Sequence, residues 1–283
     1  MFLDLNPGTV GLQVDSVDRL LRLAAEHGFG GVDLPVELIP TPEAADRAAE
    51  LADAMGLFPL PCDFLRVDDE KCDWGLARLE TILPRVRRAG CHRAYNHIWP
   101  GSNERDYEAN FAWHVERVGR LHQVLRGHGV KLGLEFIGPE TLRNTFRHPF
   151  LFQLADAVAL ADAVSEEVGI VLDTFHWYTS GGTLDDIRRY LNADRLVNVH
   201  VNDATAGRER REQMDLERAL PLETGIIDAP GVVRVLREMD YRGPVTAEPF
   251  HPWLARFREM NADAVVAEVA ESLHGLMRRS AGR

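Results

Sequence analysis

The chain has 283 residues, of which 45% are hydrophobic and 27% charged, and its formal net charge at pH 7 is -12. A chain of this length and composition can bury the core of one barrel-sized domain. A strongly acidic protein gains little from counterion release at a phosphate backbone, so we expect no nucleic-acid partner. Three cysteines without a CxxC pair argue against a disulfide framework, and no uncharged stretch approaches the roughly 20 residues that span a membrane, so we expect a cytoplasmic protein.

Short apolar runs alternate with amphipathic helical stretches through the first half of the chain. Gly28 and Gly90 follow two of these stretches, at the position where a glycine commonly ends a helix. We expect four strands over 2–5, 31–34, 57–60 and 91–98, and four helices over 14–27, 42–55, 73–89 and 108–128.

The second half repeats the pattern. Residues 179–183, Thr-Ser-Gly-Gly-Thr, lack the lysine of a phosphate loop and favour a turn that caps the next helix. Residues 203–229 form a connection longer than most in compact domains, and such loops are usually functional or disordered. We expect strands over 130–136, 168–173, 196–201 and 244–248, and helices over 149–164, 184–191, 232–239 and 261–277.

Eight alternating strand–helix units predict an α/β fold, a (β/α)8 TIM barrel that forms a single domain over residues 1–283. The main alternative is a doubly wound open sheet. That fold usually carries GxGxxG after its first strand, and residues 6–11 read Asn-Pro-Gly-Thr-Val-Gly instead. In a barrel, the long connection at 203–229 would lie on the face where active sites are built.

Four consecutive predicted strands, the fifth to the eighth, end in a side chain that can bind a metal. A lone acid at a strand end is usually a helix cap or a solvated residue, but neighbouring strand ends in a barrel lie on one arc. Three carboxylates and one imidazole suit one divalent ion, with Mn²⁺ as the predicted metal and Mg²⁺, Co²⁺ or Zn²⁺ as alternatives. The predicted metal ligands are Glu135, Asp173, His200 and Glu248.

These strand ends resemble the xylose-isomerase-like barrel superfamily, which includes inosose isomerases and ketose 3-epimerases. The similarity runs over nearly the whole chain and is most specific in LEFIGPE at 134–140, LDTFH at 172–176, VHVND at 199–203 and AEPF at 247–250. The resemblance implies the same four metal ligands and makes His176 a substrate-binding residue. Two positions depart from ketose 3-epimerases: their second glutamate is nearest to Glu140, and their substrate arginine falls on Ala206, for which Arg208 or Arg210 could substitute.

The resemblance implies a metal-dependent isomerase or epimerase that acts on a keto-sugar or keto-inositol, phosphorylated or free, as in inositol catabolism. Glu135 and Glu248 would be the catalytic bases, and the metal would stabilise an enediolate. A dehydratase or lyase of inosose or dehydroshikimate type is the alternative on the same barrel. The expected partner is a small sugar or cyclitol, and a homo-oligomer is left open.

Several further residues are candidates for substrate contacts, and each also has a structural interpretation. His176 could instead hold Asp173, Trp177 could pack in the core, and an arginine run on a loop is usually a solvated face. Asp33 and Glu37, after the second strand, could contact substrate hydroxyls. The predicted substrate-binding set is His176, His97, Trp177, Asn202, Arg208 and Arg210.

Overall fold

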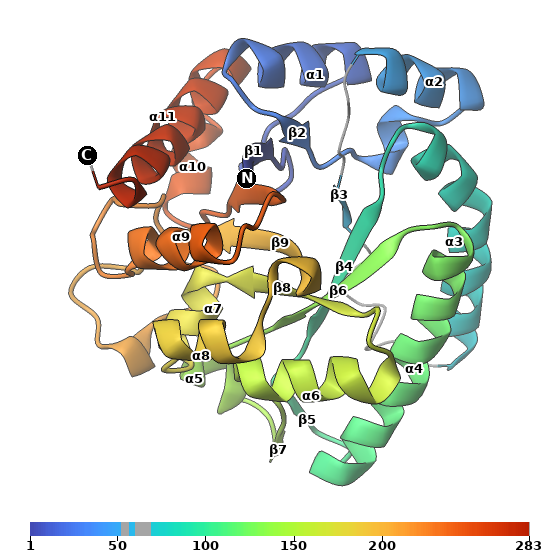
Figure 1. Ribbon diagram of the computed structural model, residues 1–283, viewed down its shortest axis with the longest axis vertical. Helices are drawn as coiled ribbons and strands as arrows, with labels where there is room; N and C mark the ends of the chain where they lie inside the picture. The colour runs from blue at the N-terminus through green and yellow to red at the C-terminus, as the bar shows by residue number, and fades with distance from the viewer. Residues whose placement is uncertain (52–56, 60–68, 283) are drawn as a thin grey trace.

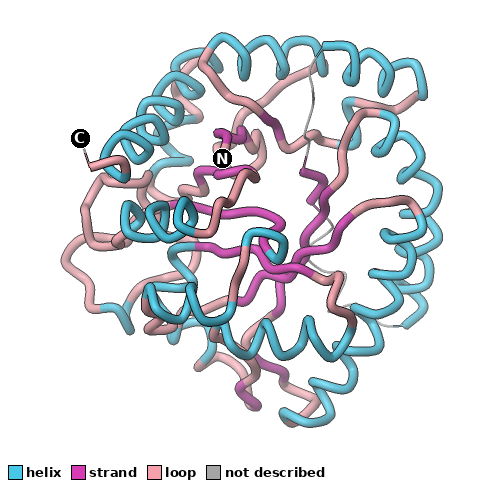
Figure 2. The backbone as a smooth tube through the Cα atoms, in the orientation of Figure 1, coloured by secondary structure: helices cyan, strands magenta, loops and turns pink. Residues whose placement is uncertain are grey.

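The computed structural model describes residues 1–51, 57–59 and 69–282. Its strands form an inner ring and its helices surround them (Figures 1 and 2). Parts of the second predicted helix and third predicted strand (residues 52–55 and 60), together with Cys62, lie outside the described residues.

The main sheet has eight strands in the hydrogen-bonded order β2-β1-β10-β9-β8-β6-β4-β3, and its paired neighbours are parallel. Its two end strands follow each other in the chain, which is the circular order of a TIM barrel. The predicted fold class is therefore confirmed. The strands are β1 (Phe2–Leu5), β2 (Gly31–Val32), β3 (Leu57–Pro59), β4 (Arg93–Ile98), β6 (Lys131–Phe136), β8 (Gly169–Asp173), β9 (Leu196–Val201) and β10 (Pro244–Ala247).

Polar side chains mark where the helices begin. Ser16 caps α1 by accepting a hydrogen bond from the Arg19 amide, and Thr183 forms a capping box with Asp186 at α8, as residues 179–183 predict. The helices are α1 (Val17–Glu26), α2 (Pro42–Leu51), α3 (Asp69–Arg88), α4 (Tyr107–Gly127), α5 (Glu140–Arg143), α6 (Leu154–Val164), α7 (Thr174–Thr179), α8 (Leu184–Tyr190), α9 (Ala229–Glu238), α10 (Trp253–Phe257) and α11 (Ala262–Ser280), with short 3-10 turns η1 (Val36–Leu38), η2 (Ala193–Arg195) and η3 (Arg210–Glu212).

Local differences from the predicted elements lie near the strand ends, where the short helices α5, α7 and α10 are additional to the predicted ones. The helix predicted over 149–164 begins at Leu154, because Pro149 instead pairs with Gly101 in a small antiparallel sheet of β5 (Gly101–Ser102) and β7 (His148–Pro149). The helix α7 follows β8 directly and is not predicted by the sequence pattern. Its first turn is capped by Asp173, whose side chain accepts a hydrogen bond from the His176 amide.

The main apolar core lies between the ring of strands and the surrounding helices. A separate small cluster, made of Tyr95, Val171 and Val197, is also buried. A Cβ at Gly133 would lie 2.8 Å from Val197 Cβ, so that close approach requires a glycine on β6. The strands also bury polar side chains, among them Glu135, Asp173 and His200, and these form the site described below.

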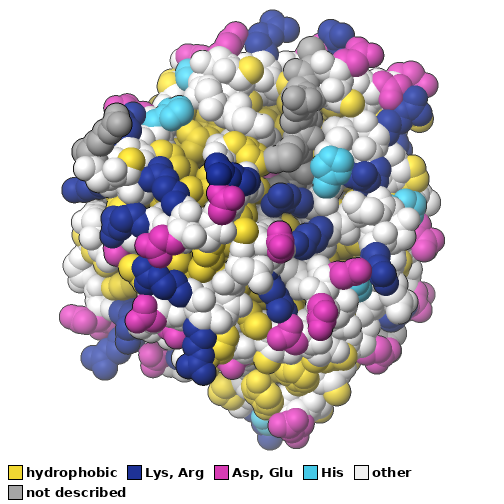
Figure 3. Space-filling view, in the orientation of Figure 1, with side chains coloured by type: hydrophobic (Ala, Val, Ile, Leu, Met, Phe, Trp, Pro, Cys, Tyr) yellow, Lys and Arg dark blue, Asp and Glu magenta, His cyan; other side chains and the backbone are white. Residues whose placement is uncertain are grey.

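On the face shown in Figure 3, basic and acidic side chains are interspersed, with hydrophobic atoms between them. None of the helices in the described ranges is both long enough and apolar enough to pass through a bilayer.

Candidate functional site

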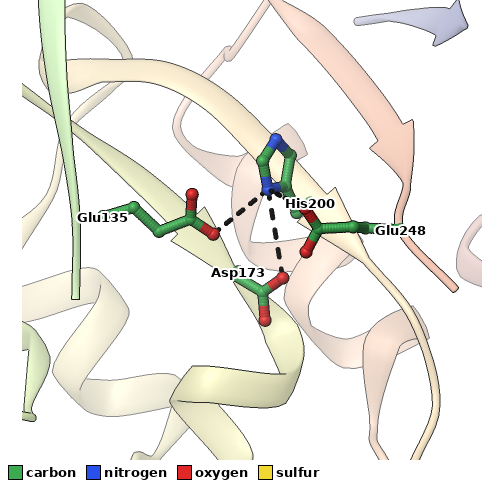
Figure 4. Close-up of side chains that lie close together, drawn as sticks. All are labelled: Glu135, Asp173, His200 and Glu248. Atoms are coloured by element: carbon green, nitrogen blue, oxygen red, sulfur yellow. Dashed lines mark hydrogen bonds and ion pairs between the residues drawn. The ribbon is translucent and has the colours of Figure 1, made fainter. Parts of the chain in front are cut away.

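Four buried side chains meet at the carboxyl ends of adjacent strands (Figure 4). Their ligand atoms all lie within 4.8 Å of one another. His200 Nδ1 is 3.1 Å from Glu135 Oε1, 3.6 Å from Glu248 Oε1 and 4.0 Å from Asp173 Oδ2. β6, β8 and β9 carry Glu135, Asp173 and His200, and Glu248 directly follows β10. The structure thus brings together the four residues that the sequence indicates.

The chemistry of this quartet fits a divalent cation. Three carboxylates buried together are unfavourable unless positive charge or a metal compensates them. Oxygen and imidazole donors at this spacing suit ions such as Mn²⁺, Mg²⁺, Co²⁺ or Zn²⁺. The buried group can therefore hold a metal ion.

The neighbouring charges shift the ionisation of the quartet in opposite directions. Burial would raise the pKa of Glu135, but His200 and His97 outweigh it and hold that pKa well below its usual value. Burial dominates at Glu248 and raises its pKa to about 8. Burial would lower the pKa of His200, but Glu135 and Glu248 raise it to about 9.

Arg218 lies directly against two of the carboxylates. Its Nη1 is 3.0 Å from Asp173 Oδ2 and 2.5 Å from Glu248 Oε2, and its Nη2 donates to Asp215 Oδ1 at 2.8 Å. The guanidinium is buried, with ring centroids of Phe175 and Phe250 at 4.7 Å and 4.9 Å. Burial alone would lower the pKa of Arg218, but the three carboxylates outweigh it and raise that pKa. Arg218 therefore brings a fixed positive charge to the site.

The long connection that carries Arg218 is organised by Asp203, which follows β9. The Asp203 carboxylate accepts hydrogen bonds from the backbone amides of residues 224–227, at 2.7 to 3.2 Å. Asp203 also exchanges two backbone hydrogen bonds with Ala219, each 2.9 Å long. Farther out, the Gln213 side chain closes a smaller loop by bonding the backbone of Thr205. These hydrogen bonds order the loop that carries Arg218.

Backbone and side-chain amides fix the orientation of Asp173. Asn202 Nδ2 donates to Asp173 Oδ2 at 3.0 Å, and the His176 amide donates to Asp173 Oδ1 at 2.8 Å. His176 Nδ1 in turn accepts from the Gly138 amide at 3.2 Å. A Cβ at Gly138 would lie 2.2 Å from the His176 carbonyl oxygen, so only glycine permits this approach.

A cavity of about 400 Å³ opens beside the quartet. Three predicted site residues line it: His97, His176 and Glu248. His97 Nε2 lies 3.1 Å from Glu135 Oε2, which places it at the quartet. The full lining in the described part of the chain is Asn6, Gly8, Thr9, Tyr95, His97, Trp99, Ile137, His176, Asp215, Leu216, Arg218, Glu248 and Phe250.

The other predicted substrate-binding residues lie away from that lining. Trp177 packs in the core and donates its indole N–H to the Thr183 carbonyl. Asn202 is buried against Asp173. Arg208 pairs with Glu217, and Arg210 lies by a separate surface pocket with Tyr178.

The sequence analysis does not select Arg218, although the residue lies on the long connection whose length indicates a functional or disordered loop. The available signal was the spacing of Asp215 and Arg218, three residues apart, in a segment otherwise crowded with arginines. That spacing alone also fits a solvated ion pair, and only the burial of Arg218 separates the two interpretations.

The fold is a parallel TIM barrel, and its buried quartet can hold a metal ion. A family model described as "Xylose isomerase-like TIM barrel" matches residues 21–275. The chain therefore belongs to the xylose isomerase-like TIM barrel family.

Individual relatives agree with this assignment. Inosose isomerase of Halalkalibacterium halodurans is 29% identical over 139 residues, which cover 49% of this chain and 46% of that protein. The match thus spans about half the length of the curated relative. A solved xylose isomerase domain protein from Alicyclobacillus acidocaldarius is 27% identical with a TM-score of 0.80, covering 99% of both chains. The IOLI protein, solved with a bound zinc atom, has a TM-score of 0.81 at 16% identity and 99% coverage of both chains, which shows the shared fold.

Proposed function

We propose that this protein is a divalent-metal-dependent isomerase or epimerase that transfers a proton next to the carbonyl of a keto-sugar or keto-inositol. The observation that carries the proposal is the meeting of four buried ligand atoms within 4.8 Å at the edge of a cavity. The cavity volume of about 400 Å³ falls in the range of small-molecule sites. Similarity to inosose isomerase over half of the chain supports the same chemistry.

The proposed roles follow from position. Glu135, Asp173, His200 and Glu248 would hold the cation, which supplies a Lewis acid for a substrate carbonyl and its developing negative charge. Glu248 lines the cavity and removes the proton from carbon, and Glu135 is the second candidate base. His176 and Arg218 bind substrate oxygens.

Mn²⁺ is the proposed ion, because carboxylates dominate the donor set and one imidazole accompanies them. The zinc in the IOLI protein makes Zn²⁺ the first alternative to test. A place in inositol catabolism and a cytoplasmic location are part of the same proposal. Asn202 is proposed to orient Asp173, and Trp177, Arg208 and Arg210 have no assigned role in the reaction.

The test is a screen of keto-sugars and inososes in deuterated water, with metal-stripped protein reloaded with Mn²⁺, Mg²⁺, Co²⁺ or Zn²⁺. We expect NMR to show deuterium at the carbon next to a carbonyl, and we expect none with metal-free protein. Loss of water with a new conjugated absorbance would favour the dehydratase alternative. Absence of exchange with all four metals would contradict the proposal.

A further inference from the structure

Two residues on the cavity wall, Asn6 and Tyr95, are joined to one buried acid behind them. Asn6 Nδ2 donates to Asp33 Oδ2 at 2.5 Å, and the Tyr95 hydroxyl donates to the same oxygen at 3.3 Å. Asn6 Nδ2 also donates to the Tyr95 hydroxyl oxygen at 3.3 Å. Asp33 itself does not line the cavity, so its contact with a ligand would be indirect.

Asp33 is held from behind by a second acid, Asp4 on β1. Among the described residues, Asp4 Oδ1 and Asp33 Oδ1 are buried without a hydrogen-bond partner, and one proton shared between the two carboxyl groups would satisfy both. Asp4 Oδ2 also accepts from Thr246 Oγ1 at 3.1 Å, and Thr246 Oγ1 lies 3.1 Å from Asn198 Nδ2. Burial raises the pKa of Asp4 to about 7 and that of Asp33 well above its usual value, which favours the shared proton. Polar side chains of β1, β9 and β10 thus surround the acid that Asn6 and Tyr95 contact.

The Tyr95 hydroxyl oxygen accepts from Asn6 Nδ2 at 3.3 Å and keeps one further lone pair for a ligand. The hydroxyl hydrogen is directed to Asp33, and the Asn6 carbonyl oxygen is occupied by the amides of Gly8 and Thr9. The Tyr95 ring packs edge-on to His200, with centroids 5.2 Å apart. Tyr95 thus offers an oriented acceptor beside the quartet, on the strand β4 that carries none of the four ligands.

We propose that Tyr95 is a specificity-determining residue that accepts a hydrogen bond from a substrate hydroxyl, and that Asp33, held by Asp4, is the positioning residue that fixes the Tyr95 hydroxyl. This inference rests on the proposed function, because it places a polyhydroxylated ligand against the quartet. It assigns recognition of a second substrate oxygen to Tyr95 on β4, four positions in the strand order from β10, the strand that Glu248 follows.

The experiment measures binding by calorimetry, with Mn²⁺-loaded protein and two probes, D-fructose and scyllo-inosose. Tyr95→Phe removes only the hydroxyl, and we expect about 10-fold weaker binding of a probe, since one buried hydrogen bond is lost. Tyr241→Phe is the matched control: its buried hydroxyl donates to the Pro244 carbonyl at 3.0 Å, outside the cavity lining, and its loss should leave binding unchanged. Thermal melts and Mn²⁺ titrations of both variants check that each one folds and binds the metal like the wild type.

Two further comparisons separate recognition from structural support. One monodeoxy derivative of D-fructose should lack the hydroxyl that Tyr95 recognises. We expect the wild type to bind this derivative as weakly as Tyr95→Phe binds D-fructose. Tyr95→Phe and the wild type should bind the derivative with equal affinity. Asp33→Asn should weaken binding in the wild-type background but not in the Tyr95→Phe background, because Asp33 acts through Tyr95.

Equal binding by Tyr95→Phe and the wild type, or failure of the wild type to bind either probe, would overturn the inference. An equal effect of Asp33→Asn in both backgrounds would overturn the role given to Asp33. The proposed function fails separately: a protein that binds a probe through Tyr95 but exchanges no deuterium keeps the hydroxyl site and loses the isomerase assignment.

Discussion

Asp203 and Ala219 are joined by two backbone hydrogen bonds, each 2.9 Å from nitrogen to oxygen. This isolated antiparallel pairing holds the residue next to Arg218 and so sets where the guanidinium meets Asp173 and Glu248. Asp203, three residues after His200, therefore helps to position the Arg218 guanidinium in the site.

Replacing Asp203 by alanine should destabilise the fold and displace Arg218. Five backbone amides would lose their shared acceptor, so we expect the free energy of unfolding to fall by about 2–4 kcal/mol in urea titrations. Asp228→Ala, which removes a single helix cap at α9, should cost about 1 kcal/mol. Equal losses in the two variants would show that Asp203 is only another cap.

Asp173→Asn should weaken Mn²⁺ binding by more than about 100-fold. Loss of a residue that only hydrogen-bonds a ligand typically lowers metal affinity by about 10- to 100-fold, and loss of a ligand should lower it further. The measurement is calorimetric titration of metal-stripped protein. Asp215→Asn is the control, since Asp215 also contacts Arg218 but lies outside the quartet, and its Mn²⁺ affinity should stay close to that of the wild type. Similar affinity in Asp173→Asn and the wild type would remove Asp173 from the ligand set.

Removing Arg218 should destabilise the metal-free protein more than the metal-loaded one. In Arg218→Met, Asp173 and Glu248 lose a buried partner, so we expect a loss of about 3–5 kcal/mol in the presence of a chelator. Added Mn²⁺ should restore part of that loss. Arg208→Met, at a more exposed pair with Glu217, should change stability by less than about 1 kcal/mol with or without metal.

Asp4 should make stability depend on pH. Its folded pKa of about 7 is raised from 3.8, so its protonated form stabilises the fold, and that contribution is lost as pH rises through about 7. The charged groups around the Asp4–Asp33 pair are Arg93, His200 and Glu248. Between pH 5 and pH 7, the unfolding free energy of the wild type relative to Asp4→Asn should fall by at most about 1.4 kcal/mol per pH unit. If the difference in unfolding free energy between the wild type and Asp4→Asn stayed constant over this range, the raised pKa of Asp4 would be contradicted.

Glu248→Gln should abolish turnover, because the amide cannot accept the proton from carbon. Deuterium exchange with the best substrate of the metal screen checks this, at a Mn²⁺ concentration that saturates the variant. Near-normal exchange with metal bound would remove the role assigned to Glu248.

The barrel could be predicted from the sequence because most of its strands are short apolar runs and most of the helices between them carry boundary signals. Gly28, for example, ends α1 with a positive φ of 78°, as its position after the periodic segment indicates. The quartet could be predicted because parallel strands end at one edge, which turns four separate sequence positions into neighbours.

Contacts that depend on a loop path or on the barrel interior could not be predicted in the same way. Arg208, Arg210 and Arg218 have similar sequence surroundings. The backbone pairing of Asp203 with Ala219 places Arg218, and not the other two, at the cavity. Likewise, Tyr95 is an ordinary strand residue by pattern, and its polar role depends on Asp33, which is distant in the chain but hydrogen-bonded in space. Long-range pairing of this kind leaves no periodic signal.

The double anchoring of the long connection has a consequence for protein engineering. Residues 206–212 lie beyond the tie between Gln213 and Thr205, whereas Arg218 lies inside the pairing of Asp203 with Ala219. We therefore expect changes of length or sequence within 206–212 to leave the Arg218 guanidinium at Asp173 and Glu248.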